Sequence, residues 1–381
     1  MTNKIVNKSS LREKRSNLNG DGVKHRRDCF GRTSLVMTSL FVGIVLLFSS
    51  CKNEEPAPAV GEFQNAVFVV NEGNFTNGNA SLTYFNHQTS EVEQQVFYRK
   101  NNAPLGDVAN SISFDENSIY IVVNNSHVVY KINSITGLYE AKTPELTSPR
   151  NLIIIDEHRA LISDLYENNL TVVNTLNMEI ISKIEIGRTS ENLLKLDNEV
   201  FITNWSAYNQ ELKNNMVLVL NTLSMEITDS IQVGVEPNSM VLDNDNNLWV
   251  LCSGGFMNEE RASLWKIDAK TKLVQKRFNF EDINSSPTKL NISPSANTLY
   301  FINKDIFQMD ISGSSLSAIP FVLASETNNF YSLGIGFDSD IYITDANDYS
   351  RNGEVYRYSA SGIIKEQFEG GLIPGAIGFM N

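Results

Sequence analysis

Four segments of the chain combine aromatic residues with Asn and Gly, a composition suited to gripping a bulky, partly flat, polar ligand by stacking and hydrogen bonding. They are NEGNFTNGNA (71–80), NWSAYNQELKNN (204–215), CSGGFMNEERA (252–262) and DANDYSRNG (345–353). The alternative is that some of these aromatic residues only cover the structure beneath them. The candidate ligand-binding residues in the four segments are Asn71, Asn74, Phe75, Asn204, Trp205, Tyr208, Phe256, Asp345, Asn347 and Tyr349.

Signals for catalysis or for a metal are weak. No histidine pairs with another histidine or with a cysteine at a metal-ligand spacing, and there is no G-x-S-x-G elbow, phosphate-binding loop or glycine fingerprint. The run LDNDNN (242–247) begins like a calcium loop but lacks the following Gly and the closing Glu, which favours a turn. We expect no catalytic residue, no metal and no cofactor, with a cation at Asp345, Asn347 and Asp348 left open as an alternative.

The elements that must position the four segments follow from a repeat. Residues 147–186 contain four apolar runs rich in Ile and Val, which polar turns separate, and this pattern predicts four short strands. An aromatic or apolar residue that opens the second run recurs every 40 to 52 residues along the chain. The period is that of a four-stranded propeller blade, so we expect an all-β, seven-bladed β-propeller. The seven landmark residues are Phe68, Tyr120, Leu161, Phe201, Trp249, Tyr300 and Tyr342.

The two ends of the chain predict how the ring closes. Residues 52–64 (KNEEPAPAVGEFQ) are rich in Pro and Glu and supply no strand before the first landmark, whereas a spare apolar run follows the last repeat. We expect Ile373–Met380 to form the innermost strand of the first blade, which leaves no free sheet edge at the seam. The expected organisation is a signal peptide (1–50), a lipidated tether (51–64) and the propeller (65–381).

The propeller also predicts where a ligand binds. The first strand of each blade lines the central channel, and the loop between the second and third strands lies at the same end as the blade-to-blade loops. All four long segments fall between predicted second and third strands, where long loops on a rigid scaffold form binding sites. The starts of the inner strands surround the channel mouth at this end, and their varied chemistry offers an asymmetric set of donors and acceptors; the alternative is a mouth that is polar because water fills it. These residues are Asn110, Arg150, Glu191, Asn238, Thr288, Tyr331 and Gly375.

The N-terminal region carries export signals. Residues 1–33 hold nine Lys or Arg and three acids, and an apolar run of about 15 residues follows, shorter than the roughly 20 that span a bilayer. Ser49-Ser50-Cys51 resembles a lipoprotein cleavage site, so we expect a lipid on Cys51. The segment KNEEP (52–56) resembles the charged signal that directs Bacteroidetes lipoproteins to the outer face of the outer membrane. We therefore expect a lipid-anchored protein of the outer membrane that faces the cell exterior.

The charge of the mature chain limits the kinds of partner that it can bind, and its cysteine content limits its disulfide bonds. Removing the nine basic and three acidic residues of the leader from the totals of 31 and 44 leaves 22 and 41, a net charge near −19. Nucleic acid is not expected as a partner at this charge. With Cys29 removed and Cys51 acylated, Cys252 is left alone, so we expect no disulfide framework.

The segment NEGNFTNGNASLTYFN (71–86), the site around Cys51 and blade units such as EPNSMVLDNDNNLWVLC (236–252) resemble the YncE-like propeller lipoproteins of the Bacteroidetes, over essentially the whole mature chain. The resemblance implies a surface protein of a group in which some members capture cobalamin or related corrinoids and pass them to a TonB-dependent outer-membrane transporter. Our leading hypothesis is a non-enzymatic, nutrient-binding lipoprotein, with a corrinoid as the first candidate ligand. The alternatives are a glycan- or protein-binding scaffold and a metal-dependent, lactonase-like hydrolase.

Overall fold

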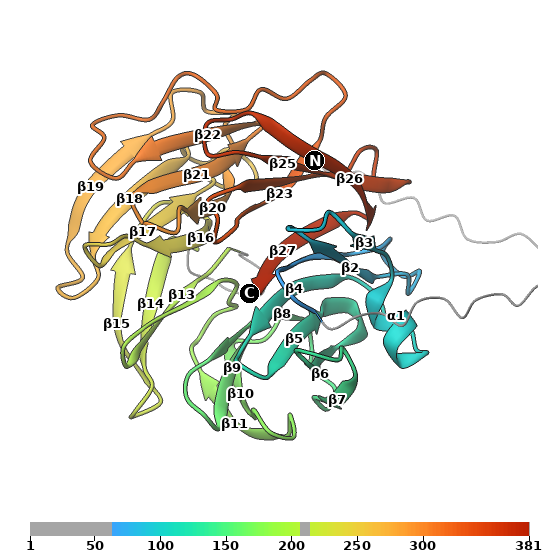
Figure 1. Ribbon diagram of the computed structural model, residues 1–381. Helices are drawn as coiled ribbons and strands as arrows, with labels where there is room; N and C mark the ends of the chain where they lie inside the picture. Colours follow the sequence, from blue (N-terminus) through green and yellow to red (C-terminus); the bar gives the residue numbers. More distant parts are fainter. Residues whose placement is uncertain (1–62, 206–213, 381) are drawn as a thin grey trace, which may run out of the picture. The chain divides into compact units, whose positions relative to one another are not determined.

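The computed structural model describes residues 63–205 and 214–380. These residues form seven antiparallel sheets, which confirms the predicted all-β, seven-bladed β-propeller (Figure 1).

Each sheet is one blade, whose strands follow one another from the channel outward in the order named. Blade 1 contains β27 (Pro374–Met380), β1 (Ala66–Asn71), β2 (Ser81–Asn86) and β3 (Val92–Glu93); blade 2 contains β4 (Ala109–Phe114), β5 (Ser118–Val123), β6 (Val128–Asn133) and β7 (Tyr139–Lys142); blade 3 contains β8 (Pro149–Ile154), β9 (Arg159–Asp164), β10 (Asn169–Asn174) and β11 (Ile180–Glu185). Blade 4 contains β12 (Leu193–Leu196), β13 (Glu199–Thr203), β14 (Met216–Asn221) and β15 (Glu226–Gln232); blade 5 contains β16 (Pro237–Leu242), β17 (Asn247–Cys252), β18 (Ser263–Asp268) and β19 (Val274–Asn279); blade 6 contains β20 (Thr288–Ile292), β21 (Thr298–Asn303) and β22 (Asp305–Asp310); blade 7 contains β23 (Phe330–Ile335), β24 (Ile341–Asp345), β25 (Asn352–Tyr358) and β26 (Ile364–Leu372).

The second strand of every blade is its most buried element. All seven landmark residues lie on these strands, on β1, β5, β9, β13, β17, β21 and β24, and each is at least 95% buried. Each second strand packs on both faces against neighbouring blades. Its sequence is therefore an almost continuous apolar run, as in SIYIVV of β5 and NLWVLC of β17. The outermost strands are polar and exposed, as in IISKIE of β11. Sheet-to-sheet packing around an axis therefore supplies the core that one blade lacks.

Blade 6 differs from the predicted four strands. After β22 the chain runs through ISGSSLSAIP (311–320), which has neither the alternation nor the β-branched content of a strand. The N–H groups of Phe321 and Val322 then donate to the carbonyl of Ile306, and one isolated bridge, Ile306 to Val322, stands in place of the fourth strand. This outer position faces solvent, where Ser, Gly and Pro are tolerated.

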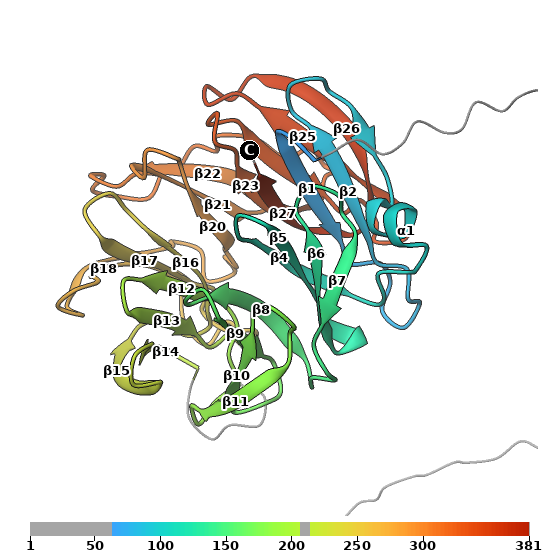
Figure 2. The same ribbon diagram turned by 60° about the horizontal axis from the view of Figure 1, so that its bottom comes forward.

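The ring closes as the ends of the chain predicted. β27 pairs with β1 from Ala66↔Met380 to Asn71↔Pro374, so the C-terminal strand completes blade 1 (Figures 1 and 2, β27 in dark red against the blue strands). The inner strands contact one another in the closed order β27, β4, β8, β12, β16, β20 and β23. Phe379 also packs on Tyr342 of blade 7, with ring centroids 5.4 Å apart, so β27 joins three blades.

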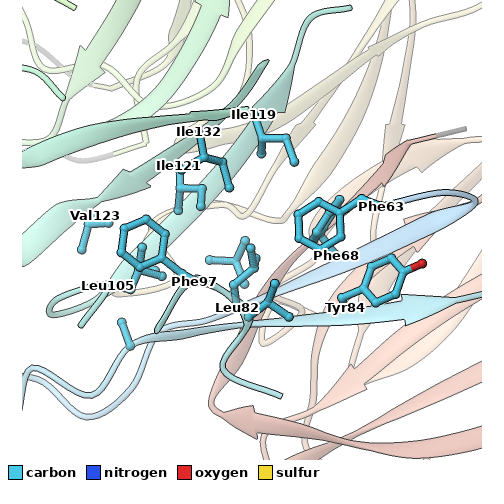
Figure 3. Packing of buried hydrophobic residues seen from close by; sticks show 14 of the residues in the cluster. Phe63, Phe68, Leu82, Tyr84, Phe97, Leu105, Ile119, Ile121, Val123 and Ile132 are labelled. Atoms are coloured by element: carbon cyan, nitrogen blue, oxygen red, sulfur yellow. The ribbon is translucent and has the colours of Figure 1, made fainter. Parts of the chain in front are cut away.

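The described residues include two short helices beside the first blades, α1 (Val96–Asn101) after β3 and the 3₁₀ helix η1 (Asn124–Ser126) after β5. Phe97 of α1 enters the core between blades 1 and 2, which contains Phe63, Phe68, Leu82 and Ile121 (Figure 3). Phe63 and Phe68 meet edge to face at 5.0 Å, so the start of the described chain is fixed to the propeller. None of the described residues belongs to a helix long and apolar enough to cross a membrane.

Candidate ligand-binding site

Each inner strand begins with an irregularity at the end of the ring that carries the long loops. In six blades the pairing register with the second strand shifts there, for example between Ala109 and Ser111 in blade 2 and between Pro237 and Ser239 in blade 5. In blade 4, Thr203 is opposed by two residues, because its carbonyl accepts from the N–H of Glu191 and its N–H donates to the carbonyl of Asn192. Such bulges turn a side chain away from the strand's own alternation. Here the bulged positions are Asn110, Arg150, Glu191, Asn238, Lys289, Tyr331 and Gly375.

Six of these seven residues are those that the sequence predicts for the channel mouth. In blade 6 the position moves by one residue, because Thr288 pairs with Ile302 as Pro237 pairs with Cys252 in blade 5. Lys289 is therefore the counterpart of Asn238, with a left-handed φ of 57°. The mouth consequently contains a second positively charged side chain, Lys289, in addition to Arg150. The alignment of strand starts in the sequence did not identify it.

Arg150 and Glu191 form one fixed ion pair at the mouth. The Nε of Arg150 donates to Glu191 Oε2 at 2.8 Å and Nη2 donates to Oε1 at 2.9 Å, the two-pronged geometry that guanidinium and carboxylate groups favour. Burial alone favours the neutral guanidine, but the carboxylate outweighs it and holds the pKa of Arg150 above its usual value. The two charges therefore neutralise each other.

Glu72, Lys289 and Tyr331 form a second group at the mouth. Glu72 follows β1 directly, and the Tyr331 hydroxyl donates to its Oε2 over 3.3 Å. The Lys289 amine donates to the carbonyl of Gly375 at 2.8 Å. Burial raises the pKa of Glu72, against the opposing charges of Lys289 and Arg150, and burial lowers the pKa of Lys289, against those of Glu72 and Glu191. Burial, and then the charge of Glu72, also raises the pKa of Tyr331.

The two amides of the mouth serve the ring itself. Asn110 donates to the carbonyl of Arg150 in the next blade at 2.7 Å, and Asn238 donates to that of Pro287 at 2.9 Å. Both satisfy backbone acceptors between blades. The arrangement supports a structural role for these two amides and leaves the charged residues to meet a ligand.

The structure separates the loop residues into two groups. Asn71, Asn204 and Asp345 are at least 99% buried, and their polar atoms bind protein groups. Asn71 donates to Thr83 at 3.0 Å and accepts from the N–H of Gly371 at 2.8 Å. Asn204 donates to the carbonyl of Thr189. Asp345 accepts from the backbone N–H groups of Asn329 and Asn347. Asn347 also donates to the carbonyl of Asn352 at 2.8 Å. These four residues shape the loops and are not free to contact a ligand through those atoms.

The other group presents aromatic rings to solvent at the end of the ring that carries the mouth, and we call it the aromatic rim: Phe75, Trp205, Phe256 and Tyr349. Their exposed fractions are 69%, 39%, 88% and 44%. All four lie in loops that follow the second strand of a blade, at the end where the inner strands begin. Tyr208 lies outside the described residues.

The backbones that carry the rim are fixed by polar contacts. Asn74 donates to the carbonyl of Tyr349 at 2.9 Å, which joins the loops of blades 1 and 7, and Glu236 accepts from the N–H of Phe256 at 3.0 Å. The Tyr349 ring meets that of Tyr331 edge to face at 5.8 Å, so the rim and the charged mouth are contiguous there. Stiff loops limit the ordering that a ligand must impose on binding.

Residues that the sequence singled out for metals have other roles. Both carboxylate oxygens of Asp243 bind neighbouring groups, including the indole N–H of Trp249 at 2.9 Å, which agrees with a turn. In the part of the chain that the structure describes, no three His, Cys, Asp or Glu side chains gather as metal ligands would. Cys252 is a buried free thiol, and burial raises its pKa.

Sequence reasoning missed Glu72 and Lys289. Glu72 was hidden inside the Asn- and Gly-rich segment NEGN, although its place directly after a second strand is a signal that could have marked it as a mouth residue. Lys289 was missed because the bulge of blade 6 lies two residues after Pro287, whereas that of blade 5 lies one residue after Pro237, and the sequence alone does not show this difference.

The fold and the side chains at its long-loop end define a class: a seven-bladed β-propeller that carries a group of charged side chains and four exposed aromatic side chains at the same end of the ring. The chain belongs to the family described as "Domain of unknown function (DUF5074)", whose model matches residues 65–369. No curated protein matches the chain.

Solved structures share the fold at low sequence identity. A quinoprotein alcohol dehydrogenase-like protein from Bacteroides thetaiotaomicron is 16% identical with a TM-score of 0.66, over 84% of this chain and 79% of that one. A functionally unknown protein from Desulfotomaculum acetoxidans is 15% identical with a TM-score of 0.62, over 83% and 99%. A putative 6-phosphogluconolactonase from Bacteroides fragilis is 12% identical with a TM-score of 0.60, over 86% and 100%. Similarity at this level establishes the propeller and not its ligand.

Proposed function

We propose that the protein is a lipid-anchored, YncE-like binding protein of the outer-membrane surface, which captures a nutrient at the channel mouth and passes it to a TonB-dependent transporter. A corrinoid such as cobalamin is the first candidate ligand. The observation that carries this proposal is the aromatic rim around the charged mouth, on one end of a rigid ring. The chain acts by binding, without catalysis.

The exposure of the rim supports a binding role. Phe256 and Phe75 are large apolar side chains that are 88% and 69% exposed, although a folded chain gains free energy by burying such rings. Glu236 and Asn79 hold the backbones of these loops by accepting from the N–H groups of Phe256 and Asn74. A flat, polar ligand would cover the rings by stacking and meet the charged mouth below them.

The corrinoid assignment is tested directly by binding. The chain from residue 52, which contains the whole propeller, is mixed with cyanocobalamin or cobinamide, and retention of colour after desalting and the heat of binding are measured. We expect retained colour and a measurable affinity. Absence of both with either corrinoid would exclude this ligand class.

Variants of the rim give the matched comparison. Phe256→Ala and Trp205→Ala remove stacking surface without opening the core, so each is expected to weaken binding by about tenfold or more with little change in melting temperature. Leu176→Ala is the control, since Leu176 is 78% exposed in the turn between β10 and β11, at the opposite end of the ring. Equal loss in the control would assign the effect to something other than the rim.

The anchor and the transporter have separate tests. If Cys51 carries a lipid, protein extracted from membranes has one thiol, that of Cys252, which reacts with a thiol reagent only after unfolding because it is buried. Two reactive thiols would contradict acylation. Co-purification of an outer-membrane transporter with the anchored protein, increased by ligand, is the expected sign of hand-over.

One observation favours a second candidate, a lactonase-like hydrolase. Glu72 adds a second carboxylate to Glu191 at the mouth, and burial raises the pKa of Glu72, as a general acid requires. This candidate predicts hydrolysis of a sugar lactone that is lost in Glu72→Gln. A bound polysaccharide or protein without any small ligand would instead favour the scaffold alternative.

A further inference from the structure

Glu72 and Lys289 face the channel mouth with hydrogen-bonding capacity that the protein does not use. Glu72 Oε2 accepts only the long contact from Tyr331, and Oε1 accepts no hydrogen bond from the described residues. The Lys289 amine donates one hydrogen bond, to the carbonyl of Gly375, and has two further N–H groups. An acceptor and a donor are therefore both available at one place.

Gly375 lies next to both groups. Its carbonyl accepts from Lys289, and its α-carbon lies under Glu72, since a β-carbon built there would stand 2.3 Å from Oε1. No ion-pair contact within 4.0 Å joins Lys289 to Glu72 or Glu191 in the described chain. The site thus differs from Arg150 and Glu191, whose charges are in direct contact.

The separation of these charges is unfavourable for the folded protein. Both side chains lie inside the ring, where burial favours the neutral form of each, and neither is neutralised by direct contact. A ligand that bonds to both groups at once would compensate this desolvation. A simple anion would meet the repulsion of Glu72, and a simple cation would meet that of Lys289.

A primary carboxamide matches this arrangement, because one planar group presents an oxygen that accepts and an NH₂ that donates. We propose that Glu72 and Lys289 bind a primary carboxamide of the ligand, with its oxygen accepting from the Lys289 amine and its NH₂ donating to the Glu72 carboxylate. This inference rests on the proposed function in placing the ligand at the mouth, and it names the ligand group that the mouth recognises. Tyr331 is a positioning residue, since its hydroxyl orients Glu72 through Oε2 and leaves Oε1 for the ligand.

The experiment uses small probes of one size, propionamide, propionate and propylammonium, with the zwitterion β-alanine, and detects binding to the chain from residue 52 by saturation-transfer NMR. We expect transfer to propionamide alone, and its loss in Glu72→Leu and in Lys289→Met. Leu176→Ala is the control that retains it. Equal transfer to propionate or β-alanine, or no transfer to propionamide, would overturn the proposal.

A second measurement separates this inference from the corrinoid assignment. If cyanocobalamin binds, Glu72→Leu and Lys289→Met should each reduce its affinity by about tenfold or more, as expected for a lost hydrogen bond to a charged group. Unchanged affinity in both variants would refute the carboxamide site and leave the proposed function standing. Binding of propionamide without cyanocobalamin would refute the corrinoid and leave the carboxamide site standing. Melting curves verify folding, and the double variant Glu72→Leu/Lys289→Met, which leaves neither charge without its counterpart and offers no donor or acceptor, replaces any single variant that fails to fold.

Discussion

The carboxylate of Glu72 lies over the α-carbon of Gly375, so close that a methyl group added to Gly375 would stand 2.3 Å from Glu72 Oε1. Glu72 follows the second strand of blade 1, and Gly375 is the bulged residue of the strand that closes the ring. The same glycine carbonyl accepts from Lys289 of blade 6. The strand that closes the ring, β27, therefore also contributes Gly375 to the charged mouth.

The first prediction concerns Gly375→Ala. The nearest atoms to the new methyl group all belong to the flexible side chain of Glu72, so the carboxylate should move while the backbone stays in place. We expect ligand affinity to fall by about tenfold or more and the melting temperature to change by less than about 2 °C. Gly370→Ala is the control, because its new methyl group meets nothing closer than 3.5 Å. A fall in melting temperature large enough to explain the lost binding would contradict this interpretation.

The second prediction concerns Glu72→Gln and pH. Because the folded state raises the pKa of Glu72 above the ordinary value of 4.5, the stability that its neutral form contributes is present below pH 4.5 and is lost as pH rises through the folded pKa. Glutamine stays neutral at every pH, so the variant should melt about 1 to 3 °C above the wild type at pH 7.5 and at the same temperature near pH 4.

A matched variant tests whether this effect belongs to Glu72. Glu191→Gln breaks the two-pronged bond to Arg150 and leaves a partly buried guanidinium without its partner, so it should lower the melting temperature at pH 7.5. If both variants raised the melting temperature, the removal of any acidic side chain from this acidic protein would be sufficient to stabilise it, and the effect would not belong to Glu72. A binding site that lowers stability in this way is a common consequence of function.

Much of the fold was predictable because it depends on apolar periodicity. The run AVFVVN with no strand before it, and PGAIGFM with no later partner, are enough to pair β1 with β27. The prediction that Trp249 and Tyr342 lie on second strands is confirmed for the same reason, because a strand between two blades must be apolar on both faces. The missing strand of blade 6 was also visible in principle, in the Ser-rich run 311–320.

The site was less predictable because it depends on where individual side chains direct their polar atoms. Asn71 and Glu72 are neighbours in the chain, yet Asn71 is buried and bonded to Ser81 and Thr83 while Glu72 is partly exposed and accepts from Tyr331 of the inner strand β23. The composition of the loop led us to predict Asn71 as a ligand-binding residue and to pass over Glu72, because composition does not show where a side chain points. Only the pairing of Thr288 with Ile302 in blade 6 shows that Lys289, and not Thr288, is the bulged residue at the mouth.

The third prediction concerns Arg357, which fastens blade 7 to blade 1. Its guanidinium donates to Asp340 at 2.6 Å, to Asp338 at 2.9 Å and to Glu366 at 2.7 Å, and also to the backbone carbonyl of His87 in blade 1 at 2.9 Å. Arg357→Met leaves three carboxylates together, one of them buried, and should cost about 3 kcal/mol at pH 7 by denaturant unfolding. Arg351→Met is the control, an exposed pair with Asp348 that should change stability by less than about 0.5 kcal/mol.

The pH dependence of this variant has a definite sign. Burial raises the pKa values of Asp338 and Glu366, but hydrogen bonds outweigh it and hold both below their ordinary values of 3.8 and 4.5. Asp338 accepts from the backbone N–H of Asp340 and from Arg357, and Glu366 accepts from the Ser90 hydroxyl and from Arg357. Their contribution is therefore present above those values and is lost as pH falls through the folded pKa values. The stability gap between wild type and Arg357→Met should narrow below about pH 4, and a gap that widens in acid would contradict the assignment.

The fourth prediction concerns the closing strand. Ending the chain at Gly371 removes β27, which exposes the inner edge of β1 and the faces of blades 2 and 7 that β27 covers. We expect the shortened chain to aggregate or to melt far below the full-length protein, because an unpaired inner edge pairs with other chains. A synthetic peptide of residues 372–381, supplied in excess, should restore both the melting temperature and ligand binding. The same peptide with Gly375→Ala should restore the melting temperature without the binding, because it returns the strand and displaces Glu72. Recovery of binding with the altered peptide would show that β27 serves the ring alone.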